Sequence, residues 1–273
     1  MGASCVRGAN AVPQWAQRWG RGMSARDAHG LGMRGMCARL LALECCSERG
    51  VMIKAEVARR YARVPDDLGS HMDLYDLLSI VVDEGAVVAN TAFTGLELSC
   101  DSMSEATFDT VLFRGCTFDH VDFSGCTFRN VRFVGCRFAS CSMNRAWLDH
   151  VDIEDCSAPG LSLLSARLAA VSMVETNLSY ANLSEASIDR LTLVGCRLVE
   201  AAMQLAKLKR VSLDDCDLTR LDVFRTSLRG MDLSTCIFVA PVLSQDYREL
   251  RGAIVSPLQA IELAGLLGIS VKD

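Results

Sequence analysis

The sequence predicts a mainly β solenoid, and three observations carry this prediction. A large apolar residue recurs at every fifth position from Phe93 to Phe238, with one small exception at Ala158. A second column of smaller residues, rich in Cys, Ala and Val, stands two positions before each large residue. Like residues in that second column recur every twenty positions. Helices repeat apolar residues every 3.6 positions and strands every two, so a five-residue period indicates a chain that turns at every repeat.

Both columns point inward in this interpretation and form the core. The large column supplies six consecutive aromatic core residues: Phe108, Phe113, Phe118, Phe123, Phe128 and Phe133. The small column supplies cysteines spaced by multiples of twenty: Cys116, Cys136, Cys156, Cys196, Cys216 and Cys236. Four repeats therefore make one coil, and about 30 repeats make about 7.5 coils. We expect a local irregularity at 158–160 and a ragged start before Ala106, where Asp101 stands in the small column.

These repeats resemble the pentapeptide-repeat family, whose consensus is Ala-(Asp/Asn)-Leu-X-X. Residues 181–185, Ala-Asn-Leu-Ser-Glu, match the consensus fully, and 121–123 and 231–233 match it with conservative variation. The resemblance covers about 150 of the 273 residues. It implies a right-handed quadrilateral β-helix with four sides to each coil. The family also includes quinolone-resistance proteins that resemble DNA and bind DNA gyrase.

The chain divides into four regions by composition. Residues 1–35, with five arginines, seven glycines and one acidic residue, predict a disordered segment. Residues 36–90 predict a helical N-terminal region that caps the first coil, and 91–243 form the β-helix. Residues 244–273 predict a C-terminal helical cap, because Ser256 suits a helix N-cap, Pro257 the first turn and Gly268 the end. In relatives directed at topoisomerases this end contributes to dimers, so the resemblance implies a monomer or a homodimer through the C-terminal segment.

The thirteen cysteines predict burial rather than chemistry. The sequence has no Cys-x-x-Cys pair and no histidine at zinc-site spacing, and cysteine alternates with Ala, Val and Thr in one column. We therefore expect no metal and no cofactor. So many thiols in a long chain favour a reducing, cytoplasmic location. No apolar run reaches the roughly 18 residues of a membrane helix, so no membrane partner is expected.

The outward positions carry segregated charge. The four histidines are scattered and no nucleophile–base grouping is visible, which predicts a non-catalytic protein. One face is acidic and is the candidate partner-binding face: Asp152, Glu154, Asp155, Glu175, Asp214, Asp215 and Asp232. The face before it is basic toward its end: Arg129, Arg167, Arg190, Lys207, Lys209, Arg210 and Arg229.

Three hypotheses of function remain open at this point. The first is a protein-interaction scaffold whose protein partner is unknown. The second, implied by the resemblance and favoured by the acidic face, is a DNA-mimicking protein that binds DNA gyrase. The third is a secreted bacterial effector with residues 1–35 as a delivery signal. The net charge of -5 argues against direct binding of nucleic acid.

Overall fold

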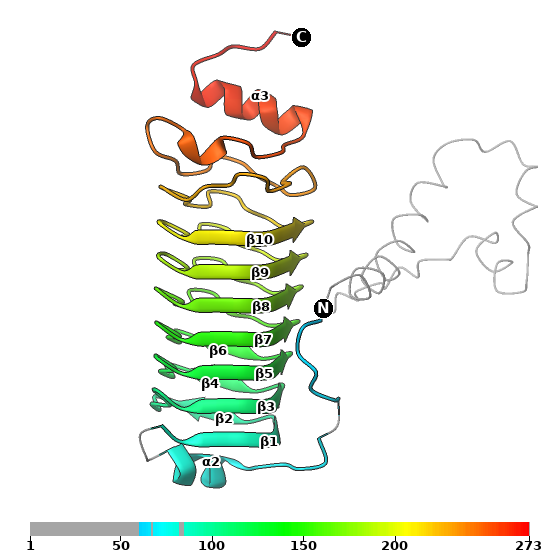
Figure 1. Ribbon diagram of the computed structural model, residues 1–273, viewed down its shortest axis with the longest axis vertical. Coiled ribbons are helices and arrows are strands. Elements are labelled where there is room, and N and C mark those ends of the chain that lie inside the picture. Colours follow the sequence, from blue (N-terminus) through cyan, green and yellow to red (C-terminus); the bar gives the residue numbers. More distant parts are fainter. Residues whose placement is uncertain (1–59, 67, 82–84, 273) are drawn as a thin grey trace, which may run out of the picture. The chain divides into compact units, whose positions relative to one another are not determined.

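The computed structural model describes residues 60–66, 68–81 and 85–272 (Figure 1). The described residues belong to a single compact unit. The segment 1–35, expected to be disordered, and residues 36–59 of the expected helical region lie outside the described residues.

Parallel strands stacked at twenty-residue intervals form the body of the protein (Figure 1). The larger sheet contains β1 (Val87–Thr94), β3 (Thr107–Arg114), β5 (Thr127–Val134), β7 (Trp147–Glu154), β8 (Arg167–Val174), β9 (Ser187–Val194) and β10 (Lys207–Asp214), in that order. A smaller sheet contains β2 (Glu97–Ser99), β4 (Thr117–Asp119) and β6 (Arg137–Ala139). The register joins Phe108 to Phe128 and Val111 to Val131. The predicted solenoid is confirmed, with about six turns between β1 and β10.

A left-handed backbone conformation at every fifth residue makes the corners of each coil. Positive φ angles recur at five-residue intervals from Gly85 to Gly230 without a gap. Most of these corner residues are not glycine: Asn90 has a φ of 53° and Leu205 a φ of 55°. Four corners in each twenty-residue coil explain why one repeat occupies one side of the coil.

Stacked aromatic rings fill the lower coils. Phe108 lies parallel to Phe128, with ring centroids 5.2 Å apart, because the two residues share a column one coil apart. Around the coil, neighbouring rings meet edge to face, as Phe118 and Phe123 do at 5.4 Å. Both are favourable aromatic geometries. All six predicted core phenylalanines and all six predicted core cysteines are buried. The Cys136 Sγ donates to the Phe113 carbonyl oxygen at 3.5 Å, so this thiol completes the backbone bonding of the coil below.

Two irregularities predicted from the sequence are absent. Ala158 is 2% exposed and its N–H donates to the Asn177 carbonyl oxygen at 2.8 Å. Gly160 has a φ of 70° and is an ordinary corner. Asp101 keeps the register as well, since its carbonyl oxygen accepts from the Asp122 N–H at 3.0 Å. A small or charged residue in the inward column is tolerated because the backbone ladder, rather than that side chain, sets the register.

Each end of the solenoid is covered differently. At the first coil, α2 (Leu74–Val81) places Leu77, 1% exposed, in the core. Residues 60–66 and 68–73 contain no helix, which differs from the helical region expected over 36–90. At the last coil, the 3-10 helix η2 (Arg248–Leu250) precedes α3 (Pro257–Leu266). A capping box joins Ser256 to Gln259 at the start of α3. The Gln259 Nε2 also donates to the Leu233 and Cys236 carbonyl oxygens at 2.9 and 2.7 Å.

The corner conformation gives a testable prediction at Gly160. No atom lies within 4 Å of a Cβ added there, so a substitution is disfavoured by the backbone conformation alone. We expect Gly160→Val to destabilise the protein by about 1–2 kcal/mol, because a β-branched residue is poorly tolerated at positive φ. Gly160→Asn is the control and stays closer to the parent, because asparagine adopts this conformation readily. Thermal unfolding measures both, and equal midpoints for the two variants would contradict the argument.

Candidate functional site

An extended segment before the solenoid lies against one side of it. This segment, residues 60–66, is called the strap, and it contains neither helix nor strand. Beneath it runs one outward column of the large sheet, in register from strand to strand: Leu112, Arg132, Asp152, Ser172 and Thr192. This column, called the strap face, belongs to the side that the sequence predicted to be acidic.

The strap face binds the amides of the strap. The Tyr61 N–H donates to Asp152 Oδ1 at 3.0 Å, and the Ala62 N–H donates to Asp152 Oδ2 at 3.2 Å. The next amide, that of Arg63, donates to the Asn130 Oδ1 at 2.6 Å. Three consecutive amides are therefore satisfied by side chains of the solenoid. Asp152 itself is 1% exposed.

Two arginines of the solenoid bind the carbonyl groups of the strap. The Arg132 Nη1 donates to the Val64 carbonyl oxygen at 3.3 Å and to Asp66 Oδ1 at 2.6 Å. The Arg114 Nη2 donates to the Asp66 carbonyl oxygen at 3.1 Å. Arg132 is 4% exposed, and a charge so deeply buried requires partners. The strap supplies two of those partners.

Apolar contacts complete the strap face. Val64 is 5% exposed and packs in a small cluster with Ala92 and Leu112, separate from the interior of the coil. Farther along the column, the Tyr61 hydroxyl lies 3.3 Å from the Thr192 Oγ1. The Tyr61 N–H bonds to Asp152 on β7 and its hydroxyl lies at Thr192 on β9. The Tyr61 side chain therefore crosses the level of β8, where Ser172 is 2% exposed.

The charges under the strap compensate one another. Burial raises the pKa of Asp152, and the amides of Tyr61 and Ala62 act against that rise. The hydrogen bond from Arg132 lowers the pKa of Asp66. Glu154 lies between two cations, 3.1 Å from Arg60 Nη2 and 3.4 Å from Arg132 Nη2. Asp152 and Glu154 are therefore already bonded to other residues of this chain.

Some residues of the predicted acidic face are covered by the strap, and others are exposed. Asp152 is buried and the Glu154 side chain is only 18% exposed, so both serve the strap rather than open solvent. Glu175 is half-buried. The remaining members are exposed: Asp155, Asp214, Asp215 and Asp232. The sequence did not indicate the strap, because residues 60–66 fall within the helical region expected over 36–90 and no sequence period marks main-chain contacts.

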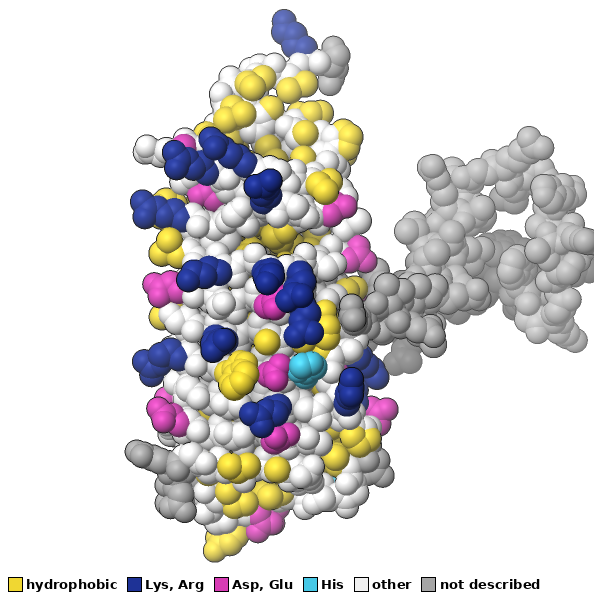
Figure 2. All heavy atoms as spheres, viewed as in Figure 1, with side chains coloured by type: hydrophobic (Ala, Val, Ile, Leu, Met, Phe, Trp, Pro, Cys, Tyr) yellow, Lys and Arg dark blue, Asp and Glu magenta, His cyan; other side chains and the backbone are white. Residues whose placement is uncertain are grey.

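The basic face keeps its charge exposed. Figure 2 shows many Lys and Arg side chains on the face in view, with a few acidic side chains among them. Arg210 pairs with Asp189, and Arg129 lies 3.3 Å from Asp109. The Arg167 guanidinium lies over the Trp147 ring, 5.8 Å from its centroid. Other cations of this face are exposed: Lys207, Lys209 and Arg229.

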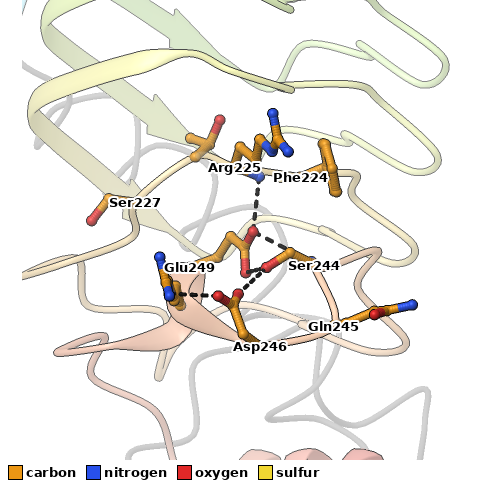
Figure 3. A pocket seen from close by; sticks show the side chains of 9 residues that line it. Phe224, Arg225, Ser227, Ser244, Gln245, Asp246 and Glu249 are labelled. Carbon is orange, nitrogen blue, oxygen red and sulfur yellow. Dashed lines mark hydrogen bonds and ion pairs between the residues drawn. The ribbon is translucent and has the colours of Figure 1, made fainter.

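An open pocket of about 850 Å³ lies near the C-terminal end, beside the corner at Arg225 (Figure 3). Its buried acid is Glu249, whose Oε1 accepts from the Arg225 N–H at 2.8 Å and whose Oε2 accepts from the Ser244 Oγ at 2.8 Å. Asp246 pairs with Arg248 at 2.5 Å. The polar residues that line this pocket thus form hydrogen bonds and ion pairs with one another. Glu249 links the loop at 244–250 to the last coils.

Groups suited to catalysis or metal binding are dispersed. Within the described parts of the chain no three His, Cys, Asp or Glu side chains form a metal-binding group. The His120 Nδ1 lies 2.8 Å from Asp119 Oδ1, and the His150 Nδ1 lies 2.8 Å from Asp149 Oδ1, so each histidine contacts the aspartate before it. Burial raises the pKa of the Cys126 thiol to about 12, which keeps it protonated at neutral pH. No helix in the described residues is long and apolar enough to cross a bilayer.

The strap contacts give a prediction at Asp152. In the Asp152→Ala variant the Tyr61 and Ala62 amides lose their acceptor, which costs about 1–3 kcal/mol of docking free energy. We expect trypsin to cut after Arg63 about five- to a hundredfold faster, measured by mass spectrometry of the timed digest. Asp214→Ala removes an exposed acid of the same side and serves as the control. Equal cleavage in both variants would contradict the assignment of Asp152 to the strap.

Comparison with known proteins agrees with the geometry. Residues 106–183 match the family model described as a pentapeptide repeat region. Among solved structures, QnrB1, a plasmid-mediated fluoroquinolone resistance protein, is 21% identical over 75% of this chain and 97% of its own, with a TM-score of 0.42. HetL, involved in heterocyst differentiation regulation in Nostoc sp. strain PCC 7120, is 20% identical over 68% of this chain and 98% of its own, with a TM-score of 0.27. No curated protein matches. The predicted resemblance is therefore confirmed, and this chain contains a pentapeptide repeat region.

Proposed function

We propose that this protein is a non-catalytic interaction scaffold whose partner is another protein. The observation that supports this most is the docking of the strap: the strap face, together with Asn130 and Arg114 beside it, holds an extended polypeptide through three amides and two carbonyl groups. Contacts of this kind recognise a main chain more than a particular sequence. The outside of the solenoid therefore has the chemistry needed to bind polypeptide.

The filled interior directs function to the outer faces. Stacked phenylalanines and buried small residues occupy the lower coils, and enzyme sites normally require a concave pocket with convergent polar groups. The nine cysteines described by the structure are free thiols, which supports the proposal of a cytoplasmic location. The segregation of acidic and basic residues onto neighbouring sides supplies a means of choosing between partners.

An alternative proposal is a DNA-mimicking protein that binds DNA gyrase, as in the quinolone-resistance members of the family. The exposed acids at Asp155, Asp214 and Asp215 favour it, because they lie on one side at the surface. The strap weakens the mimicry, since it covers Asp152 and partly neutralises Glu154. A further alternative, a secreted bacterial effector, depends on residues 1–35 acting as a delivery signal.

A supercoiling assay with purified DNA gyrase separates the gyrase proposal from the scaffold proposal. If the acidic surface mimics DNA, we expect the protein to inhibit supercoiling and Asp214→Lys/Asp215→Lys to abolish the inhibition. Glu97→Lys/Glu262→Lys makes the same charge change at exposed sites elsewhere and should keep it. Absence of inhibition, or equal inhibition by both variants, would remove the gyrase proposal. The scaffold proposal requires a stoichiometric protein complex with the full chain in cell extracts, and sedimentation of the chain only as free protein would contradict it.

The C-terminal segment supports a proposal about assembly. Leu258 on α3 is 76% exposed, and Ile261 and Leu267 are 48% and 59% exposed. Clustered exposed apolar residues are typical of an interface. We propose a homodimer through this segment, with a monomer as the alternative.

Sedimentation velocity tests the dimer. We expect the full chain to sediment as a dimer and Leu258→Lys to shift it to a monomer, because the charge would be buried at the interface. Tyr75→Lys changes an 80% exposed residue of α2, at the opposite end, and should leave the dimer intact. A monomeric parent protein, or loss of the dimer in both variants, would contradict this assignment.

A further inference from the structure

The parallel ladder of the large sheet stops at β10, although the coil continues beyond it. β10 pairs with β9 on one side and is the edge strand of the sheet. The next level, residues 227–234, bonds upward as the lower levels do: the N–H groups of Leu228, Gly230 and Leu233 donate to the carbonyl oxygens of Glu249, Gly252 and Ile254 at 2.8–2.9 Å. Among the described residues no backbone hydrogen bond joins this level to β10 below it. Figure 1 shows the wider step above β10.

The other two sides of the same coils remain joined. Asp217 still bridges to Ile237, and Asp222 still bridges to Val242. The solenoid is therefore closed on two sides and opened on the two sides that carry β10. This opening, between β10 and residues 227–234, is called the wedge.

The wedge exposes part of the core. Leu208, Val211 and Leu213, the inward residues of β10, are only half-buried. Their counterparts two strands below, Leu168, Val171 and Met173, are 0–1% exposed. A small slot of about 20 Å³ lies here, and its lining is entirely apolar, including Leu208, Val211 and Leu213 from β10 and Leu228, Met231 and Leu233 from the level above. The fold thus leaves apolar core surface open to water near the C-terminal end of the solenoid, although both ends are covered.

Basic side chains border the wedge. Lys207 and Lys209 flank Leu208 on β10 and are exposed, and Arg229 is exposed on the opposite side of the opening. Arg210, at the corner, is already paired with Asp189. Figure 2 shows apolar surface in a hollow between Lys and Arg side chains on this side of the molecule. The border is therefore cationic on the side of Lys207 and Lys209, acidic at its other end, where Asp214 and Asp232 are exposed, and the floor is apolar.

An unpaired strand edge is a template for another strand, and proteins usually cover or charge such edges. A strand that adds to an edge directs alternate side chains to opposite sides. At β10, one set would meet the apolar slot and the other set would meet Lys207 and Lys209. We propose that the wedge binds an extended peptide segment of a protein partner, with alternating apolar and acidic residues, that pairs with β10 by strand addition. This rests on the scaffold function proposed above and names its ligand class.

Fluorescence anisotropy with the full chain tests the proposal. The probe is a fluorescein-labelled peptide, Glu-Val-Glu-Val-Glu-Val-Glu, and we expect saturable binding. The Lys207→Glu/Lys209→Glu variant should weaken binding by about tenfold or more, because two favourable charge contacts become repulsive. Arg137→Glu/Arg145→Glu makes the same charge change at exposed sites on other sides and should bind as the parent does. A Glu-Gly repeat of equal length, which cannot fill the slot, should bind more weakly.

Hydrogen exchange of the same samples locates the peptide. Amides of Lys207–Asp214 should exchange more slowly with the peptide present, whereas those of Arg167–Val174 should not change. No binding up to about 1 mM peptide, or equal binding by both charge variants, would overturn the proposal. So would protection confined to residues outside β10 and 227–234, or a DNA duplex of about 12 base pairs that binds more tightly than the peptide and loses affinity in the same variant.

The scaffold function and the wedge can fail separately. A protein complex that forms in cell extracts and is unchanged by Lys207→Glu/Lys209→Glu would overturn the wedge and leave the scaffold. Loss of that complex in this variant, with retention in Arg137→Glu/Arg145→Glu, supports both. Circular dichroism and thermal melting of each variant confirm that the solenoid is folded before binding is compared.

Discussion

The left-handed corner at every fifth residue is the constraint on which the structure depends. Once the backbone must turn at that interval, each side holds two inward side chains, and four sides return the chain to its starting position one coil higher. The parallel register and the aromatic stacks follow from this return, since Phe108 meets Phe128 only because twenty residues make one coil. Non-glycine residues accept an unfavourable φ at most corners, so the ladder and the core must offset a distributed conformational cost.

Much of this fold could be predicted because the determinants repeat. Phe113 and Cys136 could be assigned to the core from spacing alone, since every coil places the same column in the same environment. The strap could not be predicted in this way. It is held by main-chain groups, and Tyr61 meets Asp152 across 91 positions of sequence, so neither residue type nor spacing identifies the contact. Asp152 was assigned to an exposed face because an outward position normally meets water.

The wedge was hidden for a different reason. Met231, Leu233 and Cys236 continue the apolar columns without a fault, and the sequence therefore predicts another regular level. Residues 227–234 keep the bonds to the level above, at 249–254, whereas pairing with β10 below is absent. The presence or absence of one main-chain ladder leaves no trace in hydrophobic periodicity. The site most suited to a partner strand is thus a place where local sequence and long-range pairing disagree.

The strap also changes how the coils depend on one another. In an ideal solenoid each coil is coupled only to its neighbours, and unfolding can spread from either end one level at a time. Here one short segment contacts Leu112 on β3, Arg132 on β5, Asp152 on β7 and Thr192 on β9. It acts as a tie across several levels, including β3, β7 and β9, which do not pair with one another, so these coils must come apart together. Among the described residues neither a backbone ladder nor a strap contact joins β10 to residues 227–234, so the level above β10 is coupled to the coils below mainly through the bridges of the other two sides.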